Sequence, residues 1–314
     1  MNQALERLLQ ENKTAFYVFD IGKLKARIAH LQAALPPEVV LCYAVKANTF
    51  ITKELIDTIH RFEICSPGEA EICRAVGVPS ENMVISGVYK TPEVMEAMVT
   101  DPSFHPIYTV ESLEQYELFR RLAKTYGRTL PLLLRLTNGS QFGINKGDIE
   151  AIVARRGETP EVDILGIQFF SGTQKTSLKK LKREVGKLDD LLTLLEEKYG
   201  FVAQELEYGP GFPVNYFQSD ELDEAELLSG FSELLHGMTH HPKVTLELGR
   251  SIAASCGTYY THIVDLKRNQ EQNYALVDGG MHHLVYFGQH MAMKQPFFHV
   301  CGKEALPATD QWNI

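Results

Sequence analysis

Eight short runs of β-forming, mostly apolar residues alternate with segments of helical periodicity along most of the 314-residue chain. The runs cover residues 39–45, 61–65, 82–86, 105–109, 130–136, 162–170, 204–208 and 243–248. Strands that are separated by helices pair in parallel, because no hairpin turn joins them. Eight such units, with a helical segment at residues 21–35 before the first strand, predict an α/β fold, namely a closed (β/α)8 barrel of the TIM type. An open, doubly wound sheet is the alternative.

The helical segments between the strands lie at residues 51–60, 67–76, 92–99, 113–126, 147–155, 177–199 and 223–238. After residue 250 this rhythm stops, and residues 251–267 and 273–277 carry strand-forming side chains with no helical pattern between them. We predict three parts: an N-terminal segment at 1–20 whose strand joins a β-rich domain, the barrel at 21–250, and that β-rich domain, incomplete here, at 251–314.

The composition is that of an ordinary globular chain, with 44% hydrophobic residues and a formal net charge of −9. The negative charge argues against nucleic-acid binding, and no apolar run is long enough to span a membrane. The N-terminus has no apolar signal core. Five scattered cysteines form no Cys-x-x-Cys pair, which favours free thiols in the cytoplasm over disulfides or a zinc site.

The first strand of the predicted barrel ends in a lysine. Six residues of the octet from Leu41 to Asn48 are apolar or aromatic, and Lys46 stands near its end. A buried lysine is costly unless it is neutralised or reacts, and burial favours the free amine that forms a Schiff base. An edge strand whose lysine meets water explains the octet equally well.

Three later strands also end in polar or small residues. Arg135 lies among leucines, so we expect an anion or an oxygen acceptor beside it; a structural ion pair is the simpler explanation. The strand ends at 169–174 and 207–212 carry glycines that let backbone N–H groups approach a phosphate, although each is equally well a tight turn. Glu247 ends the eighth strand, and a buried glutamate needs a cationic partner.

Together these residues offer an amine, a phosphate cradle and a carboxylate for a basic nitrogen. Pyridoxal phosphate (PLP) uses all three, through its aldehyde, its phosphate and its pyridine nitrogen. A Schiff-base aldolase for sugar phosphates also uses a lysine and a phosphate site, but it has no need of Glu247.

Five motifs resemble those of the fold-type III PLP-dependent decarboxylases, the superfamily of ornithine, diaminopimelate and arginine decarboxylases. They are Tyr43-Ala44-Val45-Lys46-Ala47-Asn48, Ser66-Pro67-Gly68-Glu69, Gln141-Phe142-Gly143-Ile144, Gly209-Pro210-Gly211-Phe212-Pro213 and Glu247-Leu248-Gly249-Arg250. The resemblance runs over almost the whole chain.

The resemblance implies roles for individual residues. Lys46 corresponds to the Schiff-base lysine, Glu247 to the partner of the pyridine nitrogen, and Arg135 to a contact of the ring oxygen. The other cofactor-binding residues implied are Glu63, Phe170, Gly172, Thr173, Gly209, Gly211, Gly249 and Arg250. The resemblance also implies a homodimer, and we expect no bound metal.

The chain departs from the family pattern in three places. Phe170 stands where the family has a histidine on the cofactor ring, as in a subgroup that acts on carrier-bound amino acids and shares a motif like Asp278–His283. No aspartate for a distal amine is evident around residues 286–289. The family's C-terminal segment, with a cysteine and a tyrosine that serve the partner subunit, is missing, so we expect a C-terminal truncation; Cys301 is expected to be a buried thiol, not that cysteine. If His282 and His283 lie in a strand, they point to opposite faces of it, which argues against a metal pair there.

The sequence thus predicts a PLP-dependent amino-acid decarboxylase. Its substrate is either a free diamino acid, such as diaminopimelate, ornithine or lysine, or a carrier-bound or conjugated amino acid. One alternative is a barrel that binds PLP without turnover. The other is an amino-acid racemase, which is less favoured because racemases of this fold pair an arginine, not a carboxylate such as Glu247, with the pyridine nitrogen.

Overall fold

The computed structural model describes residues 3–280, 282–283, 294, 296–301 and 310–314. The chain divides into two compact units. One comprises residues 21–214 and 223–255, and the other comprises residues 1–20, 215–222 and 256–314. Each unit is described here by itself.

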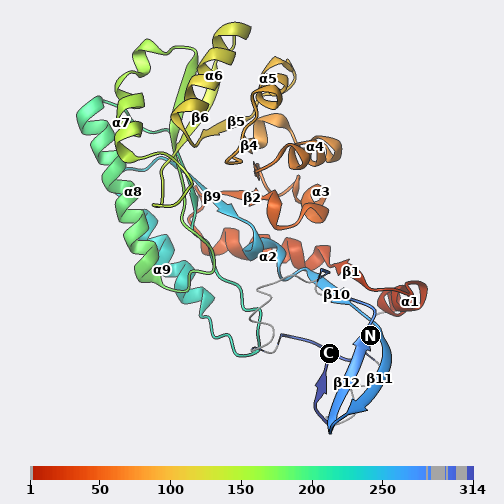
Figure 1. Ribbon diagram of the computed structural model, residues 1–314. Coiled ribbons are helices and arrows are strands. Elements are labelled where there is room, and N and C mark those ends of the chain that lie inside the picture. The colour runs from red at the N-terminus through yellow and green to blue at the C-terminus, as the bar shows by residue number, and fades with distance from the viewer. Residues whose placement is uncertain (1–2, 281, 284–293, 295, 302–309) are drawn as a thin grey trace. The chain divides into compact units, whose positions relative to one another are not determined.

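The larger unit is a closed barrel of eight parallel strands, which lie side by side in chain order from β2 to β9 (Figure 1). Their bounds are β2 (Val40–Ala44), β3 (Arg61–Ile64), β4 (Met83–Ile85), β5 (Ile107–Val110), β6 (Leu130–Arg135), β7 (Val162–Phe170), β8 (Glu205–Gly209) and β9 (Lys243–Leu248). The pairing of β2 with β9 closes the ring, which confirms the barrel and excludes the open sheet.

Helices surround the barrel (Figure 1). They are α2 (Ile21–Ala34), α3 (Thr52–Leu55), α4 (Pro67–Val76), α5 (Pro92–Thr100), α6 (Leu113–Tyr126), α7 (Lys146–Ala154), α8 (Leu178–Tyr199), α9 (Glu224–His236) and α10 (Arg250–Ala253). Local signals fix several of their ends. Ser66 and Ser112 accept backbone N–H groups at the starts of α4 and α6, and glycines in the left-handed conformation end α4, α6 and α8.

Two predicted elements of this unit were wrong in detail. The helix expected at 51–60 is a 3₁₀ turn (Thr49–Ile51) followed by the single turn α3. The strand expected from residue 251 begins instead with α10, because Arg250 to Ala253 take helical conformation directly after Gly249. Lys46 lies in a 3₁₀ turn (Val45–Ala47) just beyond the end of β2.

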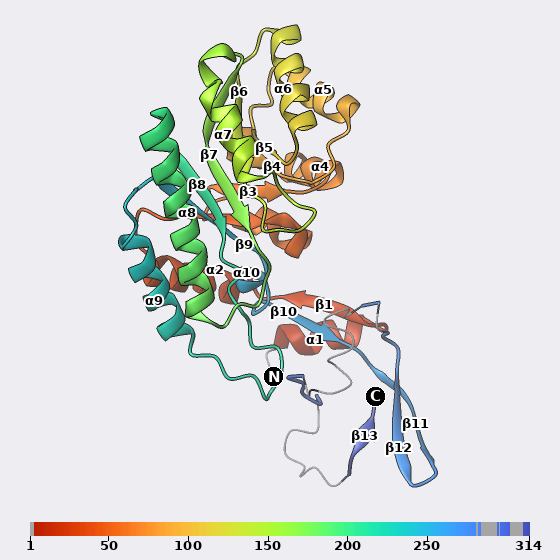
Figure 2. The ribbon, with the colours of Figure 1, turned by 60° about the vertical axis from the view of Figure 1, so that its left-hand side comes forward.

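The second unit contains α1 (Gln3–Glu11) and two small sheets. Strand β1 (Phe16–Phe19) pairs antiparallel with β10 (Gly257–Tyr260), and the rings of Phe16 and Tyr260 stack at 5.2 Å. Strands β11 (Ile263–Asn269) and β12 (Gln272–Val277) form a hairpin, and β13 (Trp312–Asn313) lies beside β12 (Figure 2).

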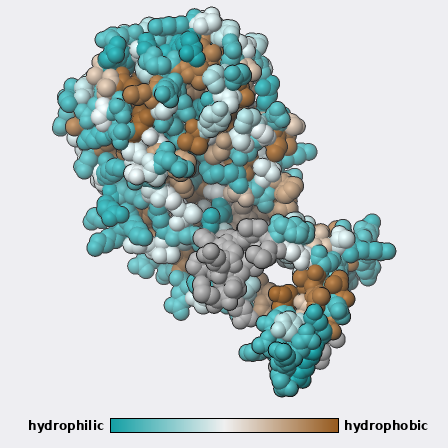
Figure 3. All heavy atoms as spheres, viewed as in Figure 1, coloured by the Kyte–Doolittle hydropathy of each residue, from teal (hydrophilic) through white to brown (hydrophobic). Residues whose placement is uncertain are grey.

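Several apolar side chains of this β-rich unit are exposed, among them Ile263, Val264 and Leu266 on β11, and Figure 3 shows hydrophobic residues gathered on it. Cys301 is exposed, so the expectation of a buried thiol was wrong. In the described part of the chain, no helix is long and apolar enough to cross a membrane.

Candidate active site

Lys46 and Glu63 meet at the carboxyl end of neighbouring strands. Glu63 lies on β3 opposite Ala44 of β2, so the turn after β2 brings Lys46 over it. The Lys46 Nζ donates to Glu63 Oε2 at 2.7 Å and to Oε1 at 2.9 Å. Glu63 is buried, whereas the Lys46 side chain is 46% exposed. The same Nζ lies 5.8 Å from the centre of the Phe170 ring, so the amine faces the end of β7.

Glu63 is the centre of a small network. It accepts from the Cys65 thiol at 2.9 Å and from the Ser86 hydroxyl, and Lys46 Nζ lies 3.4 Å from Cys65 Sγ. Burial alone lowers the pKa of Lys46, but the electrostatic effects of Glu63, Cys65 and Glu247 and the hydrogen bond to Glu63 together outweigh it and raise that pKa. Burial raises the pKa of Cys65 to about 12, and the charge of Glu63 adds to the effect. At neutral pH the site therefore holds an ammonium, a carboxylate and a neutral thiol.

Glu247 at the end of β9 is buried without an ion-pair partner among the described residues. Its Oε1 accepts from the Gln168 amide at 2.6 Å. Glu207 is also fully buried; no amide, hydroxyl or cationic group of the described residues donates to it, and its hydrogen-bond partner is the neighbouring carboxyl of Glu247 when one of the two is protonated. Burial raises the pKa of both glutamates, and the charge of Glu247 raises that of Glu207 further. The expected cationic partner of Glu247 is therefore absent from the contacts of the described residues. Glu207 and Glu247 avoid mutual repulsion because the pair keeps a proton.

Arg135 at the end of β6 forms the expected ion pair. Its Nη1 lies 2.7 Å from Glu111 Oε1, and its guanidinium carbon lies 5.0 Å from the centre of the Phe142 ring. Its Nε is buried and meets no acceptor among the described residues. Close by, the buried Lys90 donates to the Gly87 carbonyl at 2.6 Å, and burial lowers the pKa of Lys90 to about 8.

Three glycines lie where the turns after neighbouring strands approach each other closely. Gly211 has φ +66°, and a Cβ there would lie 2.1 Å from the Gly172 carbonyl oxygen. A Cβ on Gly209 would lie 2.5 Å from the Phe170 ring, and one on Gly249 would lie 3.0 Å from the Ala47 Cβ. Turns so close leave backbone N–H groups accessible to a bound anion. Thr173 is exposed in the turn after Gly172.

Helix α8 holds the turn after β7 in place through one acidic residue. Glu184 Oε2 accepts from Lys175 at 2.7 Å and from Tyr208 at 2.6 Å, while its Oε1 accepts from the Ser171 hydroxyl. The amine of Lys175 is almost fully buried in this contact. The sequence had singled out the turn but not Glu184, which fixes it.

The structure brings Lys46 together with Glu63 and Phe170, Gly209 lies beside both Phe170 and Glu247, and Gly211 lies against Gly172. Arg250 begins α10 directly after Gly249. Sequence reasoning missed the partners of the predicted residues, namely Cys65, Ser86, Lys90, Glu111, Gln168, Glu184 and Glu207. Of these, Glu111 had the clearest signal in the sequence, because it directly follows the strand β5.

His282 and His283 lie outside the barrel unit, in a turn, with ring centres 4.0 Å apart. The premise that they lie in a strand and face apart was therefore wrong. Nowhere in the described ranges do three or more His, Cys, Asp or Glu side chains gather as a metal site requires.

Comparison with protein-family models matches residues 21–254 to the family described as pyridoxal-dependent decarboxylase, pyridoxal binding domain. The match covers well over half of the chain. The chain belongs to the pyridoxal-dependent decarboxylase family, and its cofactor is PLP.

Individual relatives agree with this assignment. The diaminopimelate decarboxylase of Pseudomonas aeruginosa is 28% identical over 302 residues, which are 90% of this chain and 71% of that protein. The L-glutamyl-[BtrI acyl-carrier protein] decarboxylase of Niallia circulans is 25% identical over 95% of this chain and 74% of its own length. The crystal structure of AQ1208 from Aquifex aeolicus has a TM-score of 0.79 and 27% identity, over 90% of this chain and 69% of that one. The predicted family, cofactor and enzyme class, a PLP-dependent amino-acid decarboxylase, are confirmed.

Proposed function

We propose that the barrel mouth decarboxylates an α-amino acid with Lys46 as the amine that holds the cofactor. When bound, PLP supplies an aldehyde for an amine and a pyridine ring that withdraws electrons from the substrate's α-carbon. The observation that carries the proposal is the position of Lys46 Nζ, 5.8 Å from the Phe170 ring and bonded to Glu63. This contact turns the amine toward the glycine turns, where a phosphate-bearing ring is held.

The remaining residues have distinct proposed roles. Glu63 holds a proton on Lys46 until the amine reacts. Glu247, oriented by Gln168, accepts a hydrogen bond from the pyridine nitrogen and keeps that nitrogen protonated. Arg135 has a buried Nε that meets no acceptor among the described residues, which suits the ring oxygen.

Stacking and phosphate contacts complete the site. Phe170 offers its aromatic face to the ring but, unlike a histidine, no hydrogen bond. The backbone at the four glycines, the hydroxyl of Thr173 and the side chain of Arg250 hold the phosphate. Glycine is needed at 211 and 209 because a Cβ there would collide with the Gly172 carbonyl or the Phe170 ring and push the turns apart. No metal is needed for any of these contacts.

The substrate is an amino acid of one of three classes on which relatives act by name: a free diamino acid such as diaminopimelate, a glutamyl group on an acyl-carrier protein, or a conjugated amino acid. The test measures carbon dioxide release by the PLP-loaded protein from diaminopimelate, ornithine, lysine and glutamyl carrier protein. Release from at least one supports the proposal, and Lys46→Ala should abolish it. PLP binding without release from any would favour the non-catalytic alternative. Conversion to the opposite enantiomer without release would favour a racemase.

A homodimer and a cytoplasmic location are also proposals, the first drawn from the sequence resemblance and the second from the scattered cysteines. Sedimentation of the PLP-loaded protein at several concentrations tests the first, and a monomer at every concentration would contradict it.

A further inference from the structure

The start of α8 carries an unusual number of positive charges. Its first ten residues, Leu-Lys-Lys-Leu-Lys-Arg-Glu-Val-Gly-Lys, contain five cationic side chains, although the whole chain has a net charge of −9. The single acid among them, Glu184, turns inward to Lys175 and Tyr208. The exposed side of this half-helix therefore presents almost only positive charge.

These charges stand where a helix tolerates them least. The N-terminus of a helix carries a partial positive charge, so cations in the first turns are unfavourable, and α8 has no acidic residue in its first turn. Lys179, Arg183 and Lys187 also follow each other at intervals of four, which places like charges next to one another on one face. The stability of the helix does not explain this arrangement.

Gly186 lies in the same exposed stretch of α8. Glycine inside a helix is destabilising relative to alanine, and it is expected only where a side chain does not fit. At Gly186 a Cβ would meet nothing within 4 Å. Packing within the described residues does not require this glycine, whereas close approach of a partner to the helix would.

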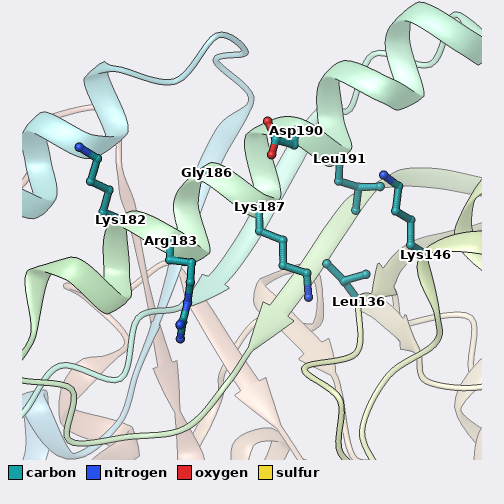
Figure 4. Close-up of a pocket in the computed structure, with 8 residues that line it drawn as sticks. All are labelled: Leu136, Lys146, Lys182, Arg183, Gly186, Lys187, Asp190 and Leu191. Carbon is teal, nitrogen blue, oxygen red and sulfur yellow. The ribbon is translucent and has the colours of Figure 1, made fainter.

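A shallow groove with a volume of about 410 Å³ lies along this stretch of α8, beside α7. Figure 4 shows the residues that line it. Lys146 contributes from α7, and Lys182, Arg183 and Lys187 contribute from α8. Lys187 is held in place, since its Nζ donates to the Thr137 carbonyl at 3.3 Å. Lys146, Lys182 and Arg183 form no ion pair with any residue that the structure describes. We call these four residues the cationic groove; Asp190 also lines it, so four cationic side chains stand against one carboxylate.

The cationic groove lies at the catalytic end of the barrel. Leu136, which also lines it, directly follows Arg135 at the end of β6, and α8 begins just after the turn that follows β7. From Lys182 to Asp190 the groove follows nine residues of α8, which span about 12 Å at the helical rise. A contact that extends so far down the outside of the barrel suits a protein surface better than the end of one small substrate.

We propose that the cationic groove is the docking surface for an acyl-carrier protein with an acidic face, which presents its tethered amino acid to the barrel mouth. The inference rests on the proposed decarboxylation and assigns its substrate to the carrier-bound class. Charge complementarity selects the partner, because opposite potentials steer two proteins together and fix their orientation.

The test uses the PLP-loaded protein with two substrates, L-glutamate on an acyl-carrier protein and L-glutamate as a small thioester without the carrier. The double variant Lys182→Glu/Arg183→Glu reverses two charges that have no partner in the described structure. Lys25→Glu, at an exposed lysine of α2, is the matched control. The ratio of kcat/KM for the carrier substrate to that for the small thioester should fall roughly tenfold or more in the double variant and stay constant in the control.

Direct binding gives a second readout that does not depend on turnover. The Kd for the loaded carrier protein should rise roughly tenfold in the double variant, and the wild-type affinity should weaken as salt screens the charges. Three results would overturn the proposal: an equal loss of kcat/KM with both substrates, an unchanged Kd, or full competition by inorganic phosphate at the carrier's own concentration. Carbon dioxide release from a free diamino acid with no carrier binding would refute the docking surface alone. Lack of release from every substrate, with carrier binding intact, would refute the decarboxylation instead.

Discussion

The Glu63→Gln change removes the charge that holds a proton on Lys46. Two unit charges 2.7 Å apart, the Nζ–Oε2 distance, attract each other by about 6 kcal/mol at an effective dielectric of 20 and by about 1.5 kcal/mol in water. Because the Lys46 side chain is 46% exposed, the true value lies toward the lower end. A loss of about 2–3 kcal/mol corresponds to a pKa of Lys46 that is lower by about 2 in the variant.

The assay follows attachment of PLP to the cofactor-free protein by visible absorbance, from about pH 6 to pH 10. Only the neutral amine reacts with an aldehyde, so the rate rises with pH until Lys46 is deprotonated. In Glu63→Gln the whole rise should move to lower pH by about 2, and attachment at neutral pH should be faster than in the wild type. Glu54→Gln, at an exposed position of α3, is the control and should leave the profile in place. If circular dichroism shows that both variants are folded and their pH profiles of PLP attachment are identical, the role of Glu63 is refuted.

Three further changes test other parts of the site. Gly211→Ala puts a Cβ against a backbone carbonyl at φ +66°, which costs about 1–2 kcal/mol in conformation alone. The Kd of this variant for PLP should therefore rise at least tenfold in an absorbance titration. The control Gly147→Ala, in α7, should leave the Kd unchanged. Glu207→Gln should change the pH dependence of stability: since the pKa of Glu207 is raised by burial, the folded wild type is favoured at low pH and loses stability as pH rises above the ordinary glutamate range. Urea unfolding should show the variant gaining about 1–3 kcal/mol on the wild type between pH 4 and pH 7, and parallel curves would mean that Glu207 shares no proton with Glu247. Glu111→Leu leaves a buried guanidinium without its anion and should cost about 3–5 kcal/mol in the same assay; a loss below about 1 kcal/mol would show that the ion pair is dispensable.

The sequence was sufficient to predict the eight barrel strands to within about two residues, because each is a compact run of β-formers between turn signals. It placed Lys46, Arg135 and Glu247 at strand ends for the same reason. It could not pair side chains across strands, since pairing depends on register. Gln168 stands opposite Glu207 in the alignment of β7 with β8, and nothing local in either strand specifies that neighbour.

The errors have a similar origin. Residues 251–253 have strand-forming and small side chains, yet they form α10, because the chain turns at Gly249 and packs Ile252 in the core. Tertiary packing overrides weak propensity in such short segments. Cys301 was assigned to the interior from its residue type alone, although burial depends on what packs around it.

Helix α8 shows how one element can combine a structural face with a functional one. Its inner face buries Leu181, Leu188 and Leu195, and each such side chain contributes about 1.5–3 kcal/mol. The outer face has two unfavourable features, which cost about 0.2–1 kcal/mol each. They are the charges of the same sign at a spacing of four and the glycine Gly186. The buried face therefore outweighs the exposed one, and the helix stays folded whatever charges it presents to solvent. Because Glu184 also fixes the turn at Ser171, the proposed carrier protein on the outer face would touch the same helix that supports the proposed phosphate turn.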